Sequence, residues 1–391
     1  MSRTFSKAVV IATALAFSAA SRRAPAAATA KPGAGKKQAS ASDVPPPSKS
    51  VRLFGGARIP ALVFTKKGTL LAFCSAGDNS RGHCQVRRST DGGKTWGKSI
   101  LVSPDSRKER VQFASISVVA DRNTGKIWCF YNRGTDRWNA KKPPIRFSYS
   151  EDDGRTWAKP VRPCDCERFP KDLPSLRSVQ GRGIQLENGR LLAPVHTIPR
   201  GKKSGPAYLY SDDAGKTWKL SQTVKGRTSV EFCAVQLADG TVYMNGRRPD
   251  GSSRGPVRWT ALSKDGGVTW SPARNEPQLP GAPCHAGLIR LTGAEQDDRS
   301  RVLFSLPANG TPQKRRDLKV WLSYDECRTW KAEDSRVLAE GDVAYSDLVV
   351  LPDKSVGCLY ESNRPWHSIW FTRFRLEWLT DGKDKVAPRK K

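Results

Sequence analysis

The chain has 391 residues, of which 37% are hydrophobic, and it holds 33 Gly and 27 Pro. This composition is typical of a folded, turn-rich protein and excludes a collagen-like or wholly disordered chain, and no apolar run is long enough for a membrane-spanning helix. With 67 Lys and Arg against 37 Asp and Glu, the formal net charge is +30. This charge attracts polyanions but does not choose among nucleic acid, acidic glycans and anionic membranes.

The first 50 residues have the features of a targeting segment and a linker. Residues 1–20 are expected to be a secretory signal peptide, because Arg3 and Lys7 flank a short apolar stretch that ends in small residues suited to cleavage. An uncleaved anchor is the alternative. Residues 21–50 are rich in Ala, Lys, Ser and Pro and are expected to form a disordered linker. This interpretation predicts a secreted or periplasmic protein.

The cysteines and glycines give no sign of a metal or cofactor. Nine cysteines permit disulfides in an exported chain, with one left over because the number is odd. Cys164 and Cys166 have no CxxC pair or suitably spaced histidine beside them. The chain also has no phosphate-binding glycine loop and no GxSxG nucleophile elbow. We therefore expect no cofactor and no metal.

An eight-residue pattern, Ser-x-Asp-x-Gly-x-Thr-Trp, occurs five times. The copies are Ser89–Trp96, Ser150–Trp157, Ser211–Trp218, Ser263–Trp270 and Ser323–Trp330, the last with Cys327 in place of Gly. Their aspartates are 61, 61, 52 and 60 residues apart. Asp and Thr side chains can bond turn amides, Gly permits a positive φ, and Trp can anchor the turn in a hydrophobic layer. The pattern predicts a structural hairpin rather than a catalytic motif.

The repeat also predicts the architecture. A strand-like run precedes each copy, and a period near 60 leaves room for about four short strands per unit, which is one propeller blade. We therefore expect an all-β, six-bladed β-propeller with four-stranded antiparallel blades over residues 51–380. The sixth unit would lack the box and consist of Asp347–Glu361, Ser368–Leu379 and N-terminal strands. Residues 381–391 are expected to be a loose basic tail.

These boxes, together with two further segments, resemble the bacterial exo-α-sialidase (neuraminidase) superfamily. The further segments are Arg58-Ile59-Pro60, similar to the family's Arg-Ile-Pro motif, and the pair Tyr345-Ser-Asp-Leu and Leu359-Tyr360-Glu361. The resemblance covers nearly all of residues 51–378 and implies the sialidase-like propeller. It also implies a retaining exo-glycoside hydrolase that releases terminal α-linked sialic acid, or a related 2-keto sugar acid, from glycoconjugates.

The resemblance implies a clamp of three arginines for the carboxylate of the sugar acid, since guanidinium groups match carboxylate oxygens and stay charged. By motif these are Arg58, Arg247 and Arg315, with Arg316 as a competing choice for the third. Glu361 would orient Arg58 through an ion pair.

The resemblance also implies a tyrosine nucleophile. A carboxylate nucleophile would be repelled by the substrate's own carboxylate, whereas a Tyr hydroxyl is neutral but needs a neighbouring base. Tyr345 matches the nucleophile and Glu231 the activating carboxylate.

The expected acid/base aspartate is where the sequence departs from the family. In the segment from Phe73 to Cys84, Ser75 replaces a Glu, Gly77 stands where an Arg is expected, and no residue aligns with the acid/base Asp. Asp78 and His83 are the nearby candidates.

Three hypotheses follow. The first is a sialidase acting on sialylated or acidic glycans, with no nucleic-acid partner and no membrane span. The second is a catalytically impaired propeller that binds sialosides or other acidic glycans without turnover. The third is a polyanion-binding protein without a sugar-acid pocket, which would show a steep salt dependence.

Overall fold

The computed structural model describes residues 44–76, 83–102, 115–132, 145–172, 174–198, 204–227, 231–248, 258–279, 281–310, 314–362 and 367–389. The predicted signal peptide, most of the predicted linker and Asp78 lie outside these residues. Within them the fold is all-β, as predicted. The exceptions are a 3-10 turn (Pro163–Asp165) and one helix, α1 (Leu376–Leu379). No helix in this part of the chain is long and apolar enough to cross a membrane.

Four sheets follow one another along the chain. The first contains β2 (Ala57–Phe64), β3 (Leu70–Ala76), β4 (His83–Ser89) and β5 (Ile100–Leu101). The second contains β6 (Ile116–Ala120), β7 (Ile127–Asn132), β8 (Ile145–Ser150) and β10 (Gly181–Arg182). The third contains β9 (Ser175–Ser178), β11 (Ile184–Gln185), β12 (Leu191–Ile198), β13 (Gly205–Ser211) and β14 (Lys219–Leu220). The fourth contains β15 (Phe232–Gln236), β16 (Val242–Arg247), β17 (Arg258–Ser263) and β18 (Arg274–Glu276).

The fifth sheet is a path of seven strands. It consists of β1 (Val51–Gly55), β19 (Gly287–Thr292), β20 (Arg301–Gly310), β21 (Arg315–Ser323), β22 (Ser335–Val350), β23 (Val356–Ser362) and β24 (Ser368–Phe374). Its two halves share the long strand β22, whose residues 335–342 pair with β21 and residues 343–350 with β23. Each half is therefore a four-stranded unit.

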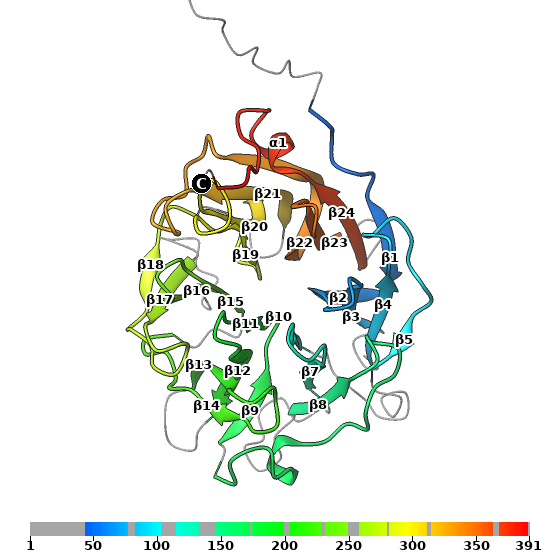
Figure 1. The fold of residues 1–391 in the computed structure, drawn as a ribbon, viewed down its shortest axis with the longest axis vertical. Helices are drawn as coiled ribbons and strands as arrows, with labels where there is room; N and C mark the ends of the chain where they lie inside the picture. Colours follow the sequence, from blue (N-terminus) through cyan, green and yellow to red (C-terminus); the bar gives the residue numbers. More distant parts are fainter. Residues whose placement is uncertain are drawn as a thin grey trace, which may run out of the picture. The chain divides into compact units, whose positions relative to one another are not determined.

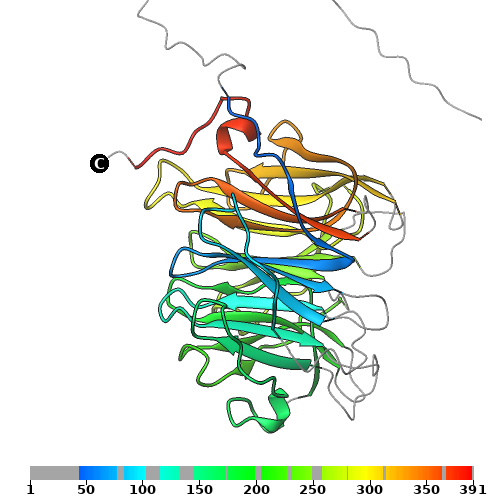
Figure 2. The ribbon, with the colours of Figure 1, turned by 90° about the vertical axis from the view of Figure 1, so that its right-hand side faces the viewer.

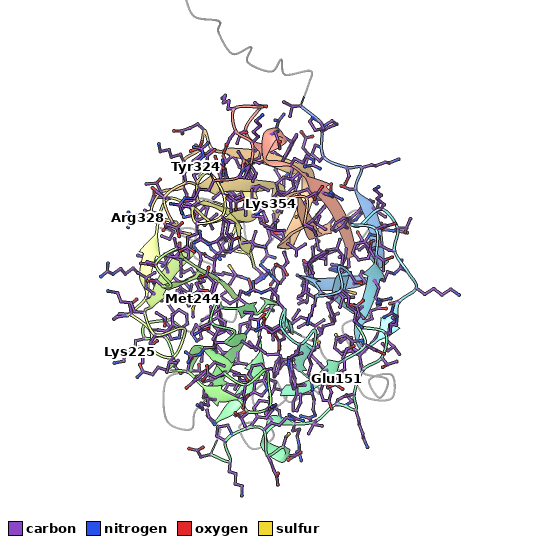
Figure 3. All side chains as sticks on the ribbon, viewed as in Figure 1. Glu151, Lys225, Met244, Tyr324, Arg328 and Lys354 are labelled. Carbon is purple, nitrogen blue, oxygen red and sulfur yellow. The ribbon has the colours of Figure 1, made fainter. Side chains whose placement is uncertain are left out.

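The sheets are arranged around a centre (Figure 1). Strands near the centre contact one another in a series: β2 contacts β6 of the second sheet, β10 of the second contacts β15 of the fourth, β15 contacts β19 of the fifth, and within the fifth β19 contacts β22, which contacts β2. The series of contacts thus returns to its starting strand. Met244 is fully buried within a sheet, whereas Lys225 and Arg328 lie at the outer rim (Figure 3).

The first and last described strands lie side by side. Strand β1 pairs with β24 (Figure 2). The Ser48 backbone N–H donates to the Arg373 carbonyl over 2.8 Å. N-terminal residues therefore complete the last unit, as the sequence predicted. One part of that prediction is wrong: residues Leu376–Leu379 form α1 instead of continuing the strand.

All five repeats make the predicted hairpin, and each begins at the last residue of a strand (β4, β8, β13, β17 or β21). In the second copy, Ser150 Oγ donates to Asp152 over 2.8 Å and accepts from Gly154 N over 2.8 Å. Thr156 Oγ1 donates to the same aspartate over 2.6 Å. The other four copies repeat these bonds. The carboxylate oxygens of these aspartates accept hydrogen bonds within the turn, which supports a structural role.

The box tryptophans join neighbouring sheets. Trp157 packs on Phe73 of the first sheet at 5.6 Å between ring centroids, and Trp218 on Trp128 of the second at 5.5 Å. Trp96 and Trp270 likewise contact Phe371 of the fifth sheet and Tyr208 of the third. The boxes therefore fasten one sheet to another as well as closing a hairpin.

Two local expectations need correction. The four-stranded antiparallel pattern fails in the second sheet, where β10 pairs with β6 in parallel, and in the third, which has five strands. Residues 381–389, the described part of the predicted tail, are also not loose. Asp384 is buried and bonds the fully buried Arg301 through two contacts of 2.8 Å, because that guanidinium needs a counterion inside the protein.

Candidate active site

Six of the eight predicted site residues lie together at the centre. Arg58 lies on β2, Arg247 at the end of β16 and Arg315 at the start of β21, while Tyr345 and Glu361 lie on β22 and β23. Glu231 comes just before β15, where it forms an isolated bridge with Gln180. Arg58 and Glu361, which are 303 positions apart, thus meet because the sheets that carry them are arranged around one centre (Figure 1).

Arg58 and Glu361 form an ion pair of 3.1 Å, and the same carboxylate accepts the backbone N–H of Ile59 over 2.7 Å. Glu361 is buried, whereas the Arg58 side chain is 28% exposed. Ile59 has a φ of 62°, an unusual value for a β-branched residue, and the bond to Glu361 holds this bulge. The buried carboxylate therefore fixes the arginine while leaving part of its guanidinium accessible.

The other two arginines differ in their partners. Arg247 pairs with Glu231 over 2.7 Å. Arg315 forms no ion pair within the described residues, and its buried Nε has no hydrogen-bond partner there. The guanidinium groups of Arg58 and Arg315 lie 5.2 and 5.3 Å from the centroid of the Tyr345 ring. With three guanidinium groups and two carboxylates, the site holds an excess positive charge beside the tyrosine.

Tyr345 donates its hydroxyl proton to a hydrogen bond with Glu231. Burial, followed by the charge of Glu231, raises the pKa of Tyr345 well above its ordinary value. Burial would also raise the pKa of Glu231, but the ion pair and hydrogen bond from Arg247 and the hydrogen bond from Tyr345 outweigh it and lower that pKa. The pair at neutral pH is therefore a protonated tyrosine and an ionised glutamate, which is the arrangement a base-activated nucleophile requires.

The two acid/base candidates stay predictions. Asp78 lies outside the described residues. His83 is the first residue of β4 and pairs with Ala76 at the end of β3. The choice between the competing arginines is clearer: Arg315 faces Tyr345 whereas Arg316 is exposed, which favours Arg315 for the clamp.

The structure adds a histidine that the sequence analysis missed. His285 is buried, and its ring edge contacts Tyr345 at 5.8 Å between centroids. Gly181 lies against this ring: a Cβ there would be 2.5 Å from His285 Cε1. Burial lowers the pKa of His285 to about 4, so its imidazole is neutral in the site. Only the scarcity of histidine, four in 391 residues, could have drawn attention to it.

A buried arginine supports the segment before β19 that carries His285. Arg258 is fully buried and donates to Asn245 Oδ1 over 2.7 Å and to the Cys284 carbonyl over 2.6 Å. Because Cys284 precedes His285, this arginine positions the histidine against Tyr345. No group of three or more His, Cys, Asp or Glu side chains suited to a metal ion occurs in the described ranges.

Comparison with known proteins identifies the family. A family profile described as "BNR repeat-like domain" matches residues 68–358. The chain belongs to this family, within the bacterial sialidase superfamily, as the sequence resemblance predicted.

Similar proteins include a sialidase of Micromonospora viridifaciens, 32% identical over 83% of this chain and 52% of the relative. A sialidase of Bacteroides fragilis is 29% identical over 78% of this chain and 60% of the relative. The chain therefore spans between half and two thirds of the length of these two relatives. The solved structure of a Hadza microbial sialidase, Hz136, aligns with a TM-score of 0.69 at 26% identity, covering 85% of this chain and 66% of that one.

Proposed function

We propose that the protein is a sialidase-like exo-glycoside hydrolase on a six-bladed β-propeller. The four separate sheets and the two halves of the seven-stranded path would be the six blades. Its substrate would be a terminal α-linked sialic acid, or a related 2-keto sugar acid, on a sialylated or acidic glycan. The similarity to proteins named as sialidases supports this class. Export to the periplasm or medium through residues 1–20 is part of the proposal.

The observation that carries the proposal is the Tyr345–Glu231 hydrogen bond inside a group of three arginines. Arg58, Arg247 and Arg315 would bind the substrate carboxylate. The Tyr345 oxygen would then attack the anomeric carbon as its proton passes to Glu231, and the bond to the leaving oxygen would break. Water would release the sugar from the tyrosine in a second displacement, so the configuration would be retained. Sialidases are an accepted exception to the two-carboxylate rule for glycosidases.

The proposal is tested by turnover of an aryl α-sialoside and of sialyl-lactose by the native chain and by Tyr345→Phe. We expect the variant to lose at least 10³-fold in kcat on both substrates, on the order of the loss for an essential nucleophile and its base (roughly 10³–10⁶). Glu361→Gln serves as a control that leaves the Tyr345–Glu231 pair in place. Unchanged hydrolysis by Tyr345→Phe would refute the nucleophile.

The leaving group decides between the two candidate functions. Because no acid/base residue is assigned, the second candidate function is a catalytically impaired protein that binds sialosides. General acid catalysis is worth roughly 10²–10⁴-fold, and an aryl leaving group needs less of it. Turnover of sialyl-lactose would establish a hydrolase and make Asp78 and His83 the next targets. Binding of sialyl-lactose without turnover, abolished by Arg58→Ala, would establish the binding protein.

A further inference from the structure

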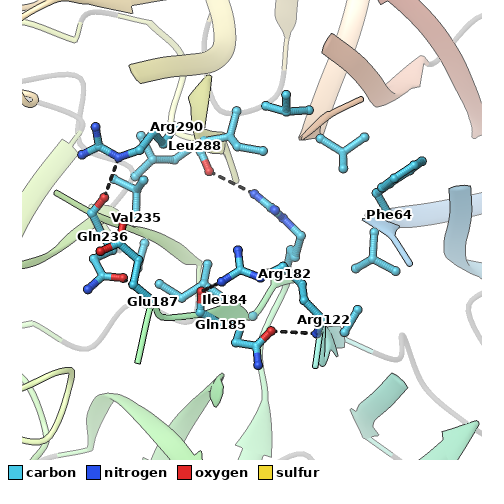
Figure 4. Close-up of a pocket in the computed structure, with 17 residues that line it drawn as sticks. Phe64, Arg122, Arg182, Ile184, Gln185, Glu187, Val235, Gln236, Leu288 and Arg290 are labelled. Carbon is cyan, nitrogen blue, oxygen red and sulfur yellow. Dashed lines mark hydrogen bonds between the residues drawn. The ribbon is translucent and has the colours of Figure 1, made fainter. Parts of the chain in front are cut away.

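The molecule has a pocket that the proposed reaction does not use. It has a volume of about 310 Å³, which falls at the lower end of the range for small-molecule sites. Its walls are mainly apolar strand ends, among them Val63, Val235 and Val349. The polar groups that enter it include the side chains of Arg122 and Arg182 (Figure 4).

This pocket lies at the opposite end of the strands that carry the candidate active site. Arg58 is near the start of β2, whereas Val63 and Phe64 at the end of β2 line the pocket. Likewise β22 contributes Tyr345 to the site and Val349 and Val350 to the pocket. The six residue steps of β2 from Arg58 to Phe64 span at most roughly 20 Å, and no residue of the candidate active site lines the pocket. A ligand in this pocket is therefore distinct from the glycan at the active site.

The positive charges that face the pocket are incompletely neutralised. Arg122 Nη2 donates to the carbonyl oxygens of Gln185 and Leu186 over 3.2 and 3.3 Å, which are neutral acceptors. The only carboxylate lining the pocket, as far as the described residues show, belongs to the exposed Glu187. The third lining arginine, Arg290, is neutralised by an ion pair with Glu326. Arg122 thus has no carboxylate partner among the described residues, whereas Arg182 shares its charge with the more distant carboxylate of Asp347.

Arg182 also has an unused donor. Its Nη2 donates to the Leu288 carbonyl over 3.3 Å, but its buried Nε has no hydrogen-bond partner among the described residues. The carboxylate of Asp347 forms a long ion pair with this Nε at 3.7 Å, which is too far for a hydrogen bond and leaves the N–H free to donate. A guanidinium with a spare donor in a half-open pocket with polar and apolar walls favours an oxygen anion, since planar N–H pairs match carboxylate and phosphate oxygens.

We propose that this pocket binds a small molecule carrying a phosphate or carboxylate group, held by Arg182 and Arg122. The apolar strand ends would contact the rest of that molecule. The two arginines would supply the charge complementarity and the orientation.

Titration calorimetry of the full chain with inorganic phosphate and with acetate, at low ionic strength, tests this site. We expect one anion per chain, with an affinity at least fivefold weaker in Arg122→Gln and lost in Arg182→Gln. The exposed Arg274 on β18 is the matched control, and Arg274→Gln should bind as the native chain does. Because Arg122 is itself exposed, Arg122→Gln decides the question even if Arg182→Gln fails to fold.

Anions could also bind the active-site arginines, so Arg315→Gln is measured in parallel. Binding that is lost in Arg315→Gln but unchanged in Arg122→Gln would overturn the proposal, as would the absence of binding by the native chain. Binding of either anion that depends on Arg122 and not on Arg315 supports it. This outcome is independent of whether the protein hydrolyses a sialoside.

Discussion

Two neighbouring arginines differ in the direction in which their side chains point. Arg315 and Arg316 have the same chemistry, and the sequence left the choice between them open. In an extended strand successive side chains point to opposite faces, so only one of the two can face the centre. Arg315 does so, over the Tyr345 ring at 5.3 Å, while Arg316 is exposed.

This difference gives a matched pair of substitutions. Arg315→Gln should lower kcat/KM for a sialoside about 10- to 100-fold, because a charge-assisted hydrogen bond is worth about 1.5–3 kcal/mol. Arg316→Gln should change it less than about threefold, since an exposed charge contributes little. Steady-state kinetics on an aryl sialoside measures both. Equal losses in the two variants would contradict the assignment.

A buried aspartate two residues after Tyr345 carries a pH dependence of stability. Asp347 accepts the backbone N–H of Leu62 over 2.8 Å and that of Leu348 over 2.9 Å, and Arg182 is the charged group beside it. Burial outweighs these contacts and raises the pKa of Asp347 to about 6. The folded state therefore binds a proton here more tightly than the unfolded chain does.

Because the pKa of Asp347 is higher in the folded state than in the unfolded chain, its contribution to stability is fully present below about pH 4. This contribution is lost as the pH rises to about 6. Asp347→Asn removes this dependence. The free energy of unfolding of the native chain should fall relative to that of the variant by an amount on the order of 2–3 kcal/mol across this window. Urea unfolding from pH 4 to 7 measures the difference. A difference that does not change with pH would show that Asp347 has an ordinary pKa.

At the scale of elements, the boxes link strands within a sheet and sheets to one another. The glycine of each typical box has a positive φ, for example 82° at Gly215. The turn also lies against the neighbouring sheet: a Cβ on Gly215 would be 2.3 Å from Trp128 Cζ2. The element therefore needs glycine for two independent reasons.

Two alanine substitutions separate the cost of backbone strain from the cost of the clash with Trp128. Gly215→Ala should destabilise the protein by about 2–4 kcal/mol, because backbone strain adds to a clash in the core. Gly226 also has a positive φ, of 84°, but no atom of the described residues lies within 4 Å of the position that a Cβ would take there. Gly226→Ala should therefore cost only about 1–2 kcal/mol, from strain alone. Thermal or urea unfolding compares the two, and an equal cost would mean that Trp128 yields without penalty.

At the scale of the whole molecule, both ends of the described chain belong to the fold. The Ser48 backbone bonds β24, and the segment after α1 returns to the sheet through the ion pair of Asp384 with Arg301. The Arg301 side chain is fully buried, so removing Asp384 leaves a buried charge with Asp298 as its remaining ion-pair partner.

Asp384→Ala should cost about 3 kcal/mol in stability, because one partner of a buried ion pair is lost. Asp381→Ala is the control in the same segment: its pair with Arg336 is exposed and should be worth at most about 1 kcal/mol. Unfolding in urea separates them. If the two variants were equally stable, the C-terminal segment would not be part of the cooperative unit.

The sequence alone determined the all-β class, the five hairpins, the family and six residues that meet at the centre. These follow from local chemistry and short motifs: a turn is specified by the residues within it, and a repeat by its period. It did not determine the choice of Arg315 over Arg316, the presence of His285 beside Tyr345, the helix at residues 376–379 or the burial of Asp384. Those depend on which distant strands approach one another and on which side chains that approach removes from water, and only the tertiary structure decides them.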